Sequence, residues 1–196
     1  MPHRRRRSHN LRNALIAVIV LMVSISVIVV AYQMNRGRPA QASNKVLLVT
    51  SMGNITLELY DDMPITAGNF KNLVRTGVYD GTIFHRVVPG FVIQGGDATS
   101  KGITVSTIPD ELPNKHSNVR GSVAMAKTSA PNSATSQFFI NLNDTNAAKL
   151  DSNYSVFGEV TVGMDIVDAI SQVPISPPND GKPLQDVTLI KAQFID

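Results

Sequence analysis

An arginine, two glutamines and four phenylalanines are concentrated in two short blocks of this 196-residue chain. Residues 84–97 read FHRVVPGFVIQGGD, and residues 136–141 read SQFFIN. Arg86 carries a permanent charge and presents several donors in a fixed fork, while Gln94 and Gln137 offer neutral amide donors and acceptors. Beside apolar rings, this set of groups is suited to gripping a peptide that contains proline.

The chemistry that these groups suit is rotation about an Xaa-Pro peptide bond. Amide resonance opposes that rotation with a barrier of roughly 18–20 kcal/mol, so the uncatalysed step takes tens to hundreds of seconds. No covalent bond to the enzyme is needed, because stabilising the twisted amide more than the planar one lowers the barrier. A donor from Arg86 can reach the prolyl nitrogen as it becomes basic, a bond gained only in the twisted state.

The two blocks resemble the core of the cyclophilin family of peptidyl-prolyl cis-trans isomerases, and the resemblance runs from about residue 45 to the C-terminus. It implies a mainly-β domain, a closed eight-stranded antiparallel barrel with two capping helices. It also implies an enzyme without a metal or other cofactor, whose catalytic residues are Arg86, Gln94 and Phe91. The substrate-binding residues that it implies are Val92, Met125, Ala126, Lys127 (by its backbone), Gln137, Phe139, Leu150 and Tyr154.

The chain departs from the family pattern at three positions. Val92 stands where many cyclophilins have methionine, and Tyr154 aligns with a histidine of many members. Lys149 takes the place of a tryptophan in the last wall of the pocket, which removes a ring edge and an indole N–H. We therefore expect catalysis to survive and cyclosporin to bind weakly.

Charge is distributed unevenly between the N-terminal segment and the rest. Residues 1–44 hold seven arginines and no acidic residue, whereas residues 45–196 hold eleven Lys and Arg against all fifteen Asp and Glu. The domain alone therefore has a net charge of −4, which argues against nucleic-acid binding. The chain has no cysteine, which excludes disulfides and thiolate metal sites.

The N-terminal segment predicts a membrane anchor. Residues 14–31 contain no charge, and at about 1.5 Å per residue a helix of this length approaches the ~30 Å thickness of the hydrocarbon core. The basic residues 1–13 predict a cytoplasmic N-terminus, with the domain outside. The alternative is a signal peptide cleaved after Ala42, because residues 40–42 read AQA. Residues 32–44 are polar and predict a flexible linker.

Hydrophobic periodicity predicts many short strands and two helices in residues 45–196. Residues 45–50 and 55–60 form an expected hairpin, with its turn at Gly53 and Asn54. One helix is expected from an N-cap at Thr66 to a stop at Gly77, and a second over Met164–Ser171. Further strands are expected over residues 82–88, 91–94, 119–126, 137–142, 155–162 and 187–194. Periodicity alone does not distinguish a barrel from a sandwich.

We therefore expect a monomeric, membrane-tethered isomerase that acts outside the cytoplasmic membrane on unfolded or newly exported polypeptides. Two other readings stay open: a module that binds proline peptides without catalysis, and a structural β-domain that shares only the fold. His85 and Asp97 do not suffice for a metal site, so we expect His85 to be structural. Gly95 and Gly96 lack the remainder of a phosphate-binding loop, and we expect them to turn the backbone beside the groove.

Overall fold

The computed structural model describes residues 18, 20–28, 30, 43–176 and 181–196, and it divides the chain into two units at Ala42 and Ser43. In the first unit, the described residues are helical and exposed. None of the helices in the described residues is both long and apolar enough to cross a bilayer. The predicted anchor over residues 14–31 lies partly outside those residues. The predicted cytoplasmic segment lies wholly outside them, as does the linker up to residue 42.

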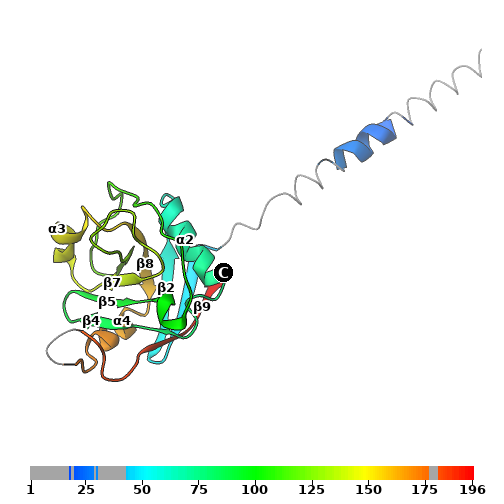
Figure 1. Cartoon of the computed structure of the whole chain (residues 1–196). Coiled ribbons are helices and arrows are strands. Elements are labelled where there is room, and N and C mark those ends of the chain that lie inside the picture. The colour runs from blue at the N-terminus through cyan, green and yellow to red at the C-terminus, as the bar shows by residue number, and fades with distance from the viewer. Residues whose placement is uncertain (1–17, 19, 29, 31–42, 177–180) are drawn as a thin grey trace, which may run out of the picture. The chain divides into compact units, whose positions relative to one another are not determined.

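The second unit is a mainly-β domain (Figure 1). Its described residues form three α-helices and two short 3₁₀ helices, η1 (Ala98–Lys101) and η2 (Asp144–Asn146). The α-helices are α2 (Pro64–Arg75), α3 (Ala147–Leu150) and α4 (Met164–Ser171). The strands are β1 (Lys45–Thr50), β2 (Gly53–Leu59), β3 (Thr82–Ile83), β4 (Arg86–Val88), β5 (Val92–Gly95), β6 (Ser122–Met125), β7 (Phe138–Asn141), β8 (Val156–Val162) and β9 (Thr188–Ile195).

The strands form one antiparallel sheet in the order β3-β9-β1-β2-β8-β6-β7-β5-β4. The expected closed barrel of eight strands is thus corrected to an open one of nine. The reason is that the single strand expected over residues 82–88 breaks at Phe84 and His85. Its first part pairs with β9 and its second with β5, so the two edges of the sheet are neighbours along the chain.

The first hairpin turns two residues earlier than expected. Thr50 pairs with Gly53, so Ser51 and Met52 form the turn and Gly53 begins β2. Gly53 is still required, because its φ is +137°, a backbone conformation that residues with a side chain rarely adopt. A Cβ there would also lie 2.6 Å from Cδ1 of Ile166 on α4, but that atom is the flexible end of its side chain, so the backbone conformation explains this glycine.

Helix α2 also begins earlier than expected, at Pro64, and Thr66 is a buried residue inside it. The N-cap residue is Met63, which provides no side-chain hydrogen bond. The carboxylate of Glu111 takes that role from a distant loop, accepting the backbone N–H groups of Ile65 at 3.0 Å and Thr66 at 2.6 Å. A long-range contact thus replaces the local cap. The second expected helix, Met164–Ser171, is confirmed as α4.

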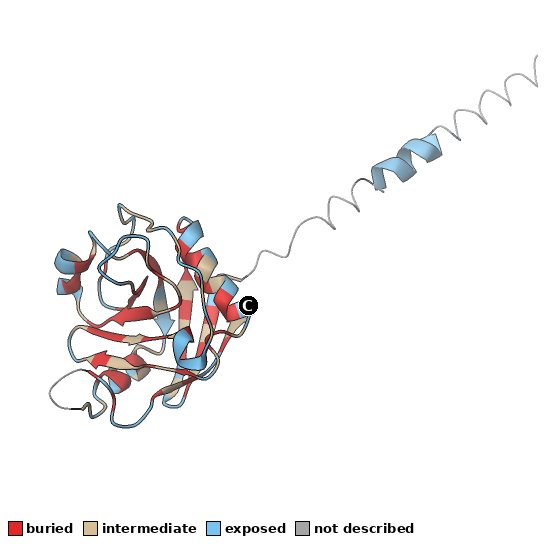
Figure 2. Ribbon diagram, viewed as in Figure 1, coloured by how far each residue is buried: buried red, intermediate tan, exposed pale blue. Residues whose placement is uncertain are grey.

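The main core lies on the inner face of the sheet, where α2 and α4 both contribute to it (Figure 2). Four aromatic rings meet at its centre, with Phe70 lying 4.9 Å from both Tyr79 and Phe157 and 5.4 Å from Phe138 between ring centroids. This interior holds the strands in register, and the residues expected to bind substrate lie mainly on the opposite face.

Candidate active site

Antiparallel pairing brings three of the chemically informative positions into one row. Arg86 on β4 lies opposite Gln94 on β5, and Gln94 lies opposite Phe139 on β7. Phe139 in turn lies opposite Ala124 on β6. Directly opposed residues on adjacent strands place their side chains on the same face, so the row joins the two blocks 84–97 and 136–141.

The pleat separates this face from the interior. On β7, Phe138 and Ile140 enter the main core, whereas Phe139 belongs to a second, smaller apolar cluster on the other face. We call this second group the site cluster. Its buried members are Val92, Ala124, Ala126, Phe139, Leu150 and Val156, and Tyr60, Phe91 and Tyr154 pack against it.

The site cluster forms the apolar part of a hollow of about 250 Å³, which we call the site hollow. Phe139 is only 4% exposed, and its ring meets that of Tyr154 edge to face, with 5.5 Å between centroids. A rigid aromatic floor of this kind suits a proline ring. The residues that line the hollow are Arg86, Phe91, Val92, Gln94, Ala126, Lys127, Phe139, Leu150 and Tyr154.

A chain of polar side chains runs along the rim of the site hollow. The guanidinium of Arg86 donates through Nη1 to Oε1 of Gln94 at 3.4 Å, and Nε2 of Gln94 donates to Oε1 of Gln137 at 2.8 Å. The first hydrogen bond is long and therefore weak, so it orients the guanidinium without fixing it tightly. Within the described part of the chain, Arg86 makes no ion pair. Its remaining donors are thus available to a bound group.

The family described as "Cyclophilin type peptidyl-prolyl cis-trans isomerase/CLD" matches residues 45–194. The chain belongs to this cyclophilin family. A peptidyl-prolyl cis-trans isomerase of Acinetobacter baylyi is 46% identical over 164 residues, covering 79% of this chain and 87% of its own. Peptidyl-prolyl cis-trans isomerase A of Dickeya dadantii is 40% identical over 190 residues, covering 92% and 97%.

Among solved structures, the chain is similar to a cyclophilin-type isomerase of Cryptosporidium parvum crystallised in the presence of the dipeptide Ala-Pro. The TM-score is 0.70 at 29% identity, and the match covers 78% of this chain and 99% of the other. Together with the family match, these relatives identify the chain as a cyclophilin-type peptidyl-prolyl cis-trans isomerase.

Nine of the eleven residues that the cyclophilin resemblance implied line the site hollow. Gln137 lies beside it, where it bonds to Gln94 and lines a second hollow. Met125 does not reach the site hollow. It is 2% exposed and belongs to the main core, because it alternates along β6 with Ala124 and Ala126 of the site cluster.

Buried asparagines that sequence reasoning missed support this cyclophilin site from behind. Asn146 donates through Nδ2 to the carbonyl of Phe91 at 2.7 Å and to Oδ1 of Asn141 at 2.9 Å. Asn141 donates in turn to Oδ1 of Asn118 at 3.1 Å, and Asn118 to the carbonyl of Tyr154 at 3.2 Å. The sequence could have indicated this supporting role, because asparagine is depleted in strands and Asn141 lies inside a predicted one.

His85 and Asp97 lie beside Gln137, and both have shifted pKa values. Burial lowers the pKa of His85 below its usual range, and the nearby Asp97 carboxylate only partly opposes this. Burial also raises the pKa of Asp97, but hydrogen bonds from Thr99 outweigh it and the net shift is downward. Among the described residues, no three His, Asp or Glu side chains gather as a metal site would require.

The glycine after β5 lets the backbone turn away beside the hollow, as expected. Gly96 has a φ of +77°, and a Cβ there would lie 2.8 Å from the rings of Phe138 and Tyr79. Only glycine satisfies both the left-handed conformation and the lack of space.

Proposed function

We propose that Arg86 catalyses the isomerisation by stabilising the twisted Xaa-Pro amide, without a covalent intermediate. The proline ring rests on Phe91 and Phe139 in the site hollow, and the acyl side rotates. A guanidinium donor engages the prolyl nitrogen as its lone pair leaves amide resonance. The observation that carries the proposal is the position of Arg86 at the hollow, with one long hydrogen bond to Gln94 and no ion pair among the described residues.

The test is cis/trans exchange of an Ala-Pro-Phe peptide, measured by NMR with the purified full-length chain. We expect Arg86→Ala to reduce the catalysed rate by about two orders of magnitude, roughly 3 kcal/mol at the barrier. Arg86→Lys keeps the charge but loses the fork, and we expect it to recover only part of the rate. Equal exchange in the parent and both variants would remove Arg86 from the mechanism. Peptide binding without faster exchange would instead indicate a binding module.

We propose that the substrates are unfolded or newly exported polypeptides outside the cytoplasmic membrane. Slow Xaa-Pro bonds can limit the refolding of exported chains, which gives an isomerase a purpose there. The uncharged residues 14–31, preceded by basic residues 1–13, support export with the N-terminus retained inside. The match to the Dickeya dadantii relative covers 92% of this chain, which is more than residues 45–196 alone. The similarity therefore extends into the N-terminal segment.

The two forms of export differ in mass and location. An uncleaved anchor keeps the full-length mass in the membrane fraction, with the domain accessible to protease from outside. Cleavage after Ala42 releases a chain that begins at Ser43. Mass spectrometry of the fractionated protein separates these outcomes, and full-length protein in the cytosolic fraction would contradict both.

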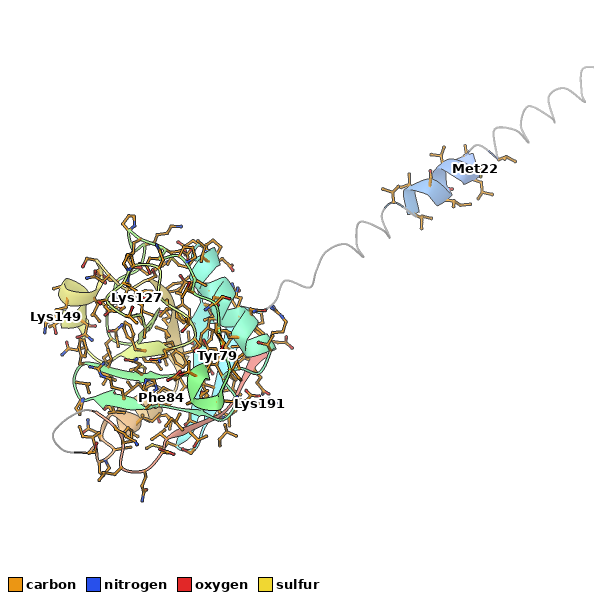
Figure 3. All side chains as sticks on the ribbon, in the orientation of Figure 1. Met22, Tyr79, Phe84, Lys127, Lys149 and Lys191 are labelled. Atoms are coloured by element: carbon orange, nitrogen blue, oxygen red, sulfur yellow. The ribbon has the colours of Figure 1, made fainter. Side chains whose placement is uncertain are left out.

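We propose that cyclosporin binds this cyclophilin weakly, because Lys149 stands where the family pattern has a tryptophan. Lys149 is exposed on α3 and does not line the site hollow, although the next residue, Leu150, does (Figure 3). We expect Lys149→Trp to tighten cyclosporin binding by tenfold or more in a titration, since a buried tryptophan supplies a large apolar area and a donor. Unchanged affinity would show that position 149 does not form that wall.

A further inference from the structure

A second hollow of about 150 Å³ lies next to the site hollow, and the two share Gln94, Ala126 and Lys127 as walls. The second hollow is completed by uncharged residues, namely Thr128, Ser133, Thr135 and Gln137. Lys127 is thus the one charged residue among those that the structure describes as lining it. Whether its charge acts in the hollow depends on what holds its ammonium group.

Asp110 holds that ammonium group from behind. The Nζ of Lys127 lies 2.6 Å from Oδ2 of Asp110, and the two side chains are only 10% and 13% exposed. Asp110 does not line the second hollow but lies with Lys127 around a separate void of about 10 Å³. The pair therefore neutralises the lysine charge through a residue outside the lining of the second hollow (Figure 3 labels Lys127).

A neighbouring loop holds Asp110 in this position. Its Oδ2 also accepts the N–H of Asn132 at 3.0 Å, and its own N–H donates to Oδ1 of Asn132 at 2.8 Å. Two further bonds hold the loop itself, from Thr128 Oγ1 to Ser133 Oγ at 2.8 Å and from Ser133 Oγ to the carbonyl of Ala130 at 2.7 Å. An ion pair that is this enclosed and braced has a defined geometry, unlike a mobile surface pair.

The direction of a bound peptide assigns the second hollow to residues before the proline. The backbone of Ala126 and Lys127 is expected to bind substrate, and we take the peptide to pair with this segment as an antiparallel strand. The second hollow extends beyond Lys127 along the chain, toward Thr128 and Ser133. The N-terminal part of an antiparallel peptide therefore lies on that side, before the chain reaches the site hollow. Alternate side chains of an extended peptide face the same way. With proline in the site hollow, the residue two positions earlier faces the second hollow.

We propose that the Lys127–Asp110 pair sets the substrate preference of this isomerase, favouring an uncharged side chain two positions before the proline. Asp110 acts through Lys127 and is a positioning residue. With Asp110 in place, neither charge acts in the second hollow, so acidic and basic side chains lose their hydration without gaining a partner. This inference rests on the proposed peptide-binding mode and adds to it the chemistry of the substrate.

The experiment compares three peptides of the form Gly-Xaa-Ala-Pro-Phe, with Gln, Glu or Lys at Xaa, using the full-length chain and catalysed exchange by NMR. The parent should prefer the Gln peptide. Asp110→Asn retains the shape and an acceptor for Asn132 but frees the lysine charge. We expect this variant to raise the Glu-to-Gln ratio of kcat/KM about fivefold, and we expect the gain to fade in high salt.

Two further variants make the result specific. In the double variant Asp110→Asn with Lys127→Met the gain for the Glu peptide should vanish, because the responsible charge is gone. The matched control is Asp168→Asn, which breaks the exposed 2.7 Å pair with Arg120 and should leave the peptide ratios unchanged. The inference is overturned if Asp110→Asn changes all three peptides in parallel, or if the double variant keeps the gain. Absence of catalysis on every peptide by the parent would instead refute the proposed function.

Discussion

Phe138 and Phe139 are adjacent on β7 and allow the two faces of the sheet to be tested separately. Phe138 is fully buried in the main core, where its ring lies 5.4 Å from Phe70, 5.5 Å from Tyr79 and 6.1 Å from Phe84. Phe139 forms the floor of the site hollow, and among the described residues Tyr154 is its one ring partner. We predict that replacing each by leucine separates stability from activity.

The expected magnitudes follow from these contacts. An aromatic pair is worth about 0.5–1.5 kcal/mol beyond the area that it buries. Phe138→Leu weakens three such pairs, so it should lower the free energy of unfolding by about 2–3 kcal/mol and leave kcat/KM within about twofold. Phe139→Leu weakens one pair beside an open hollow, so its cost in stability should be about 1 kcal/mol. It removes a ring face from the proline seat, and a loss of about 1.4 kcal/mol in the transition state is tenfold in kcat/KM.

Two measurements on the same proteins decide the outcome. Urea unfolding with an unchanged slope gives the change in stability, and NMR exchange of an Ala-Pro-Phe peptide gives the activity. The reasoning fails if Phe139→Leu retains full activity, or if Phe138→Leu loses as much activity as Phe139→Leu while still folded. Either result would mean that the pleat does not separate the core from the site.

Two predictions concern pH. Burial raises the pKa of Asp151, but hydrogen bonds from Ser117 and Asn118 lower it by more, so the folded pKa lies below its usual range. The ionised carboxylate therefore stabilises the fold above about pH 4, and this stabilisation is lost as pH falls through the folded pKa. Asp151→Asn should lower the free energy of unfolding by about 1.5–3 kcal/mol at pH 7. That difference should shrink in urea unfolding at pH 3, and a constant difference would contradict the assignment. Burial lowers the pKa of His85, so the unfolded chain takes up the proton first and stability should fall as pH drops below about 6.5. His85→Gln should flatten the unfolding free energy between pH 7 and 5 relative to the parent, and an equally steep profile would show that His85 is not responsible.

Local patterns were sufficient where a feature depends on nearby residues. The apolar run within residues 137–142 predicted a strand, and β7 is confirmed over Phe138–Asn141. The spacing of Ile166, Val167 and Ile170 predicted α4, and its bounds are those expected. Predictions failed where the deciding partner is remote. Glu111 caps the start of α2 in place of Thr66, although it lies 45 residues from Thr66 along the chain.

The sequence by itself determined the family, the strands that carry the site and the identity of most residues around the hollow, because these depend on residue type and short spacing. Only the tertiary structure decided which face each strand presents, and it turned Met125 inward by the pleat while leaving Ala126 in the site cluster. It also brought Asp110 to Lys127 from a loop 17 residues away. The physical reason is that register and loop closure depend on the packing of the whole core, which no local segment encodes.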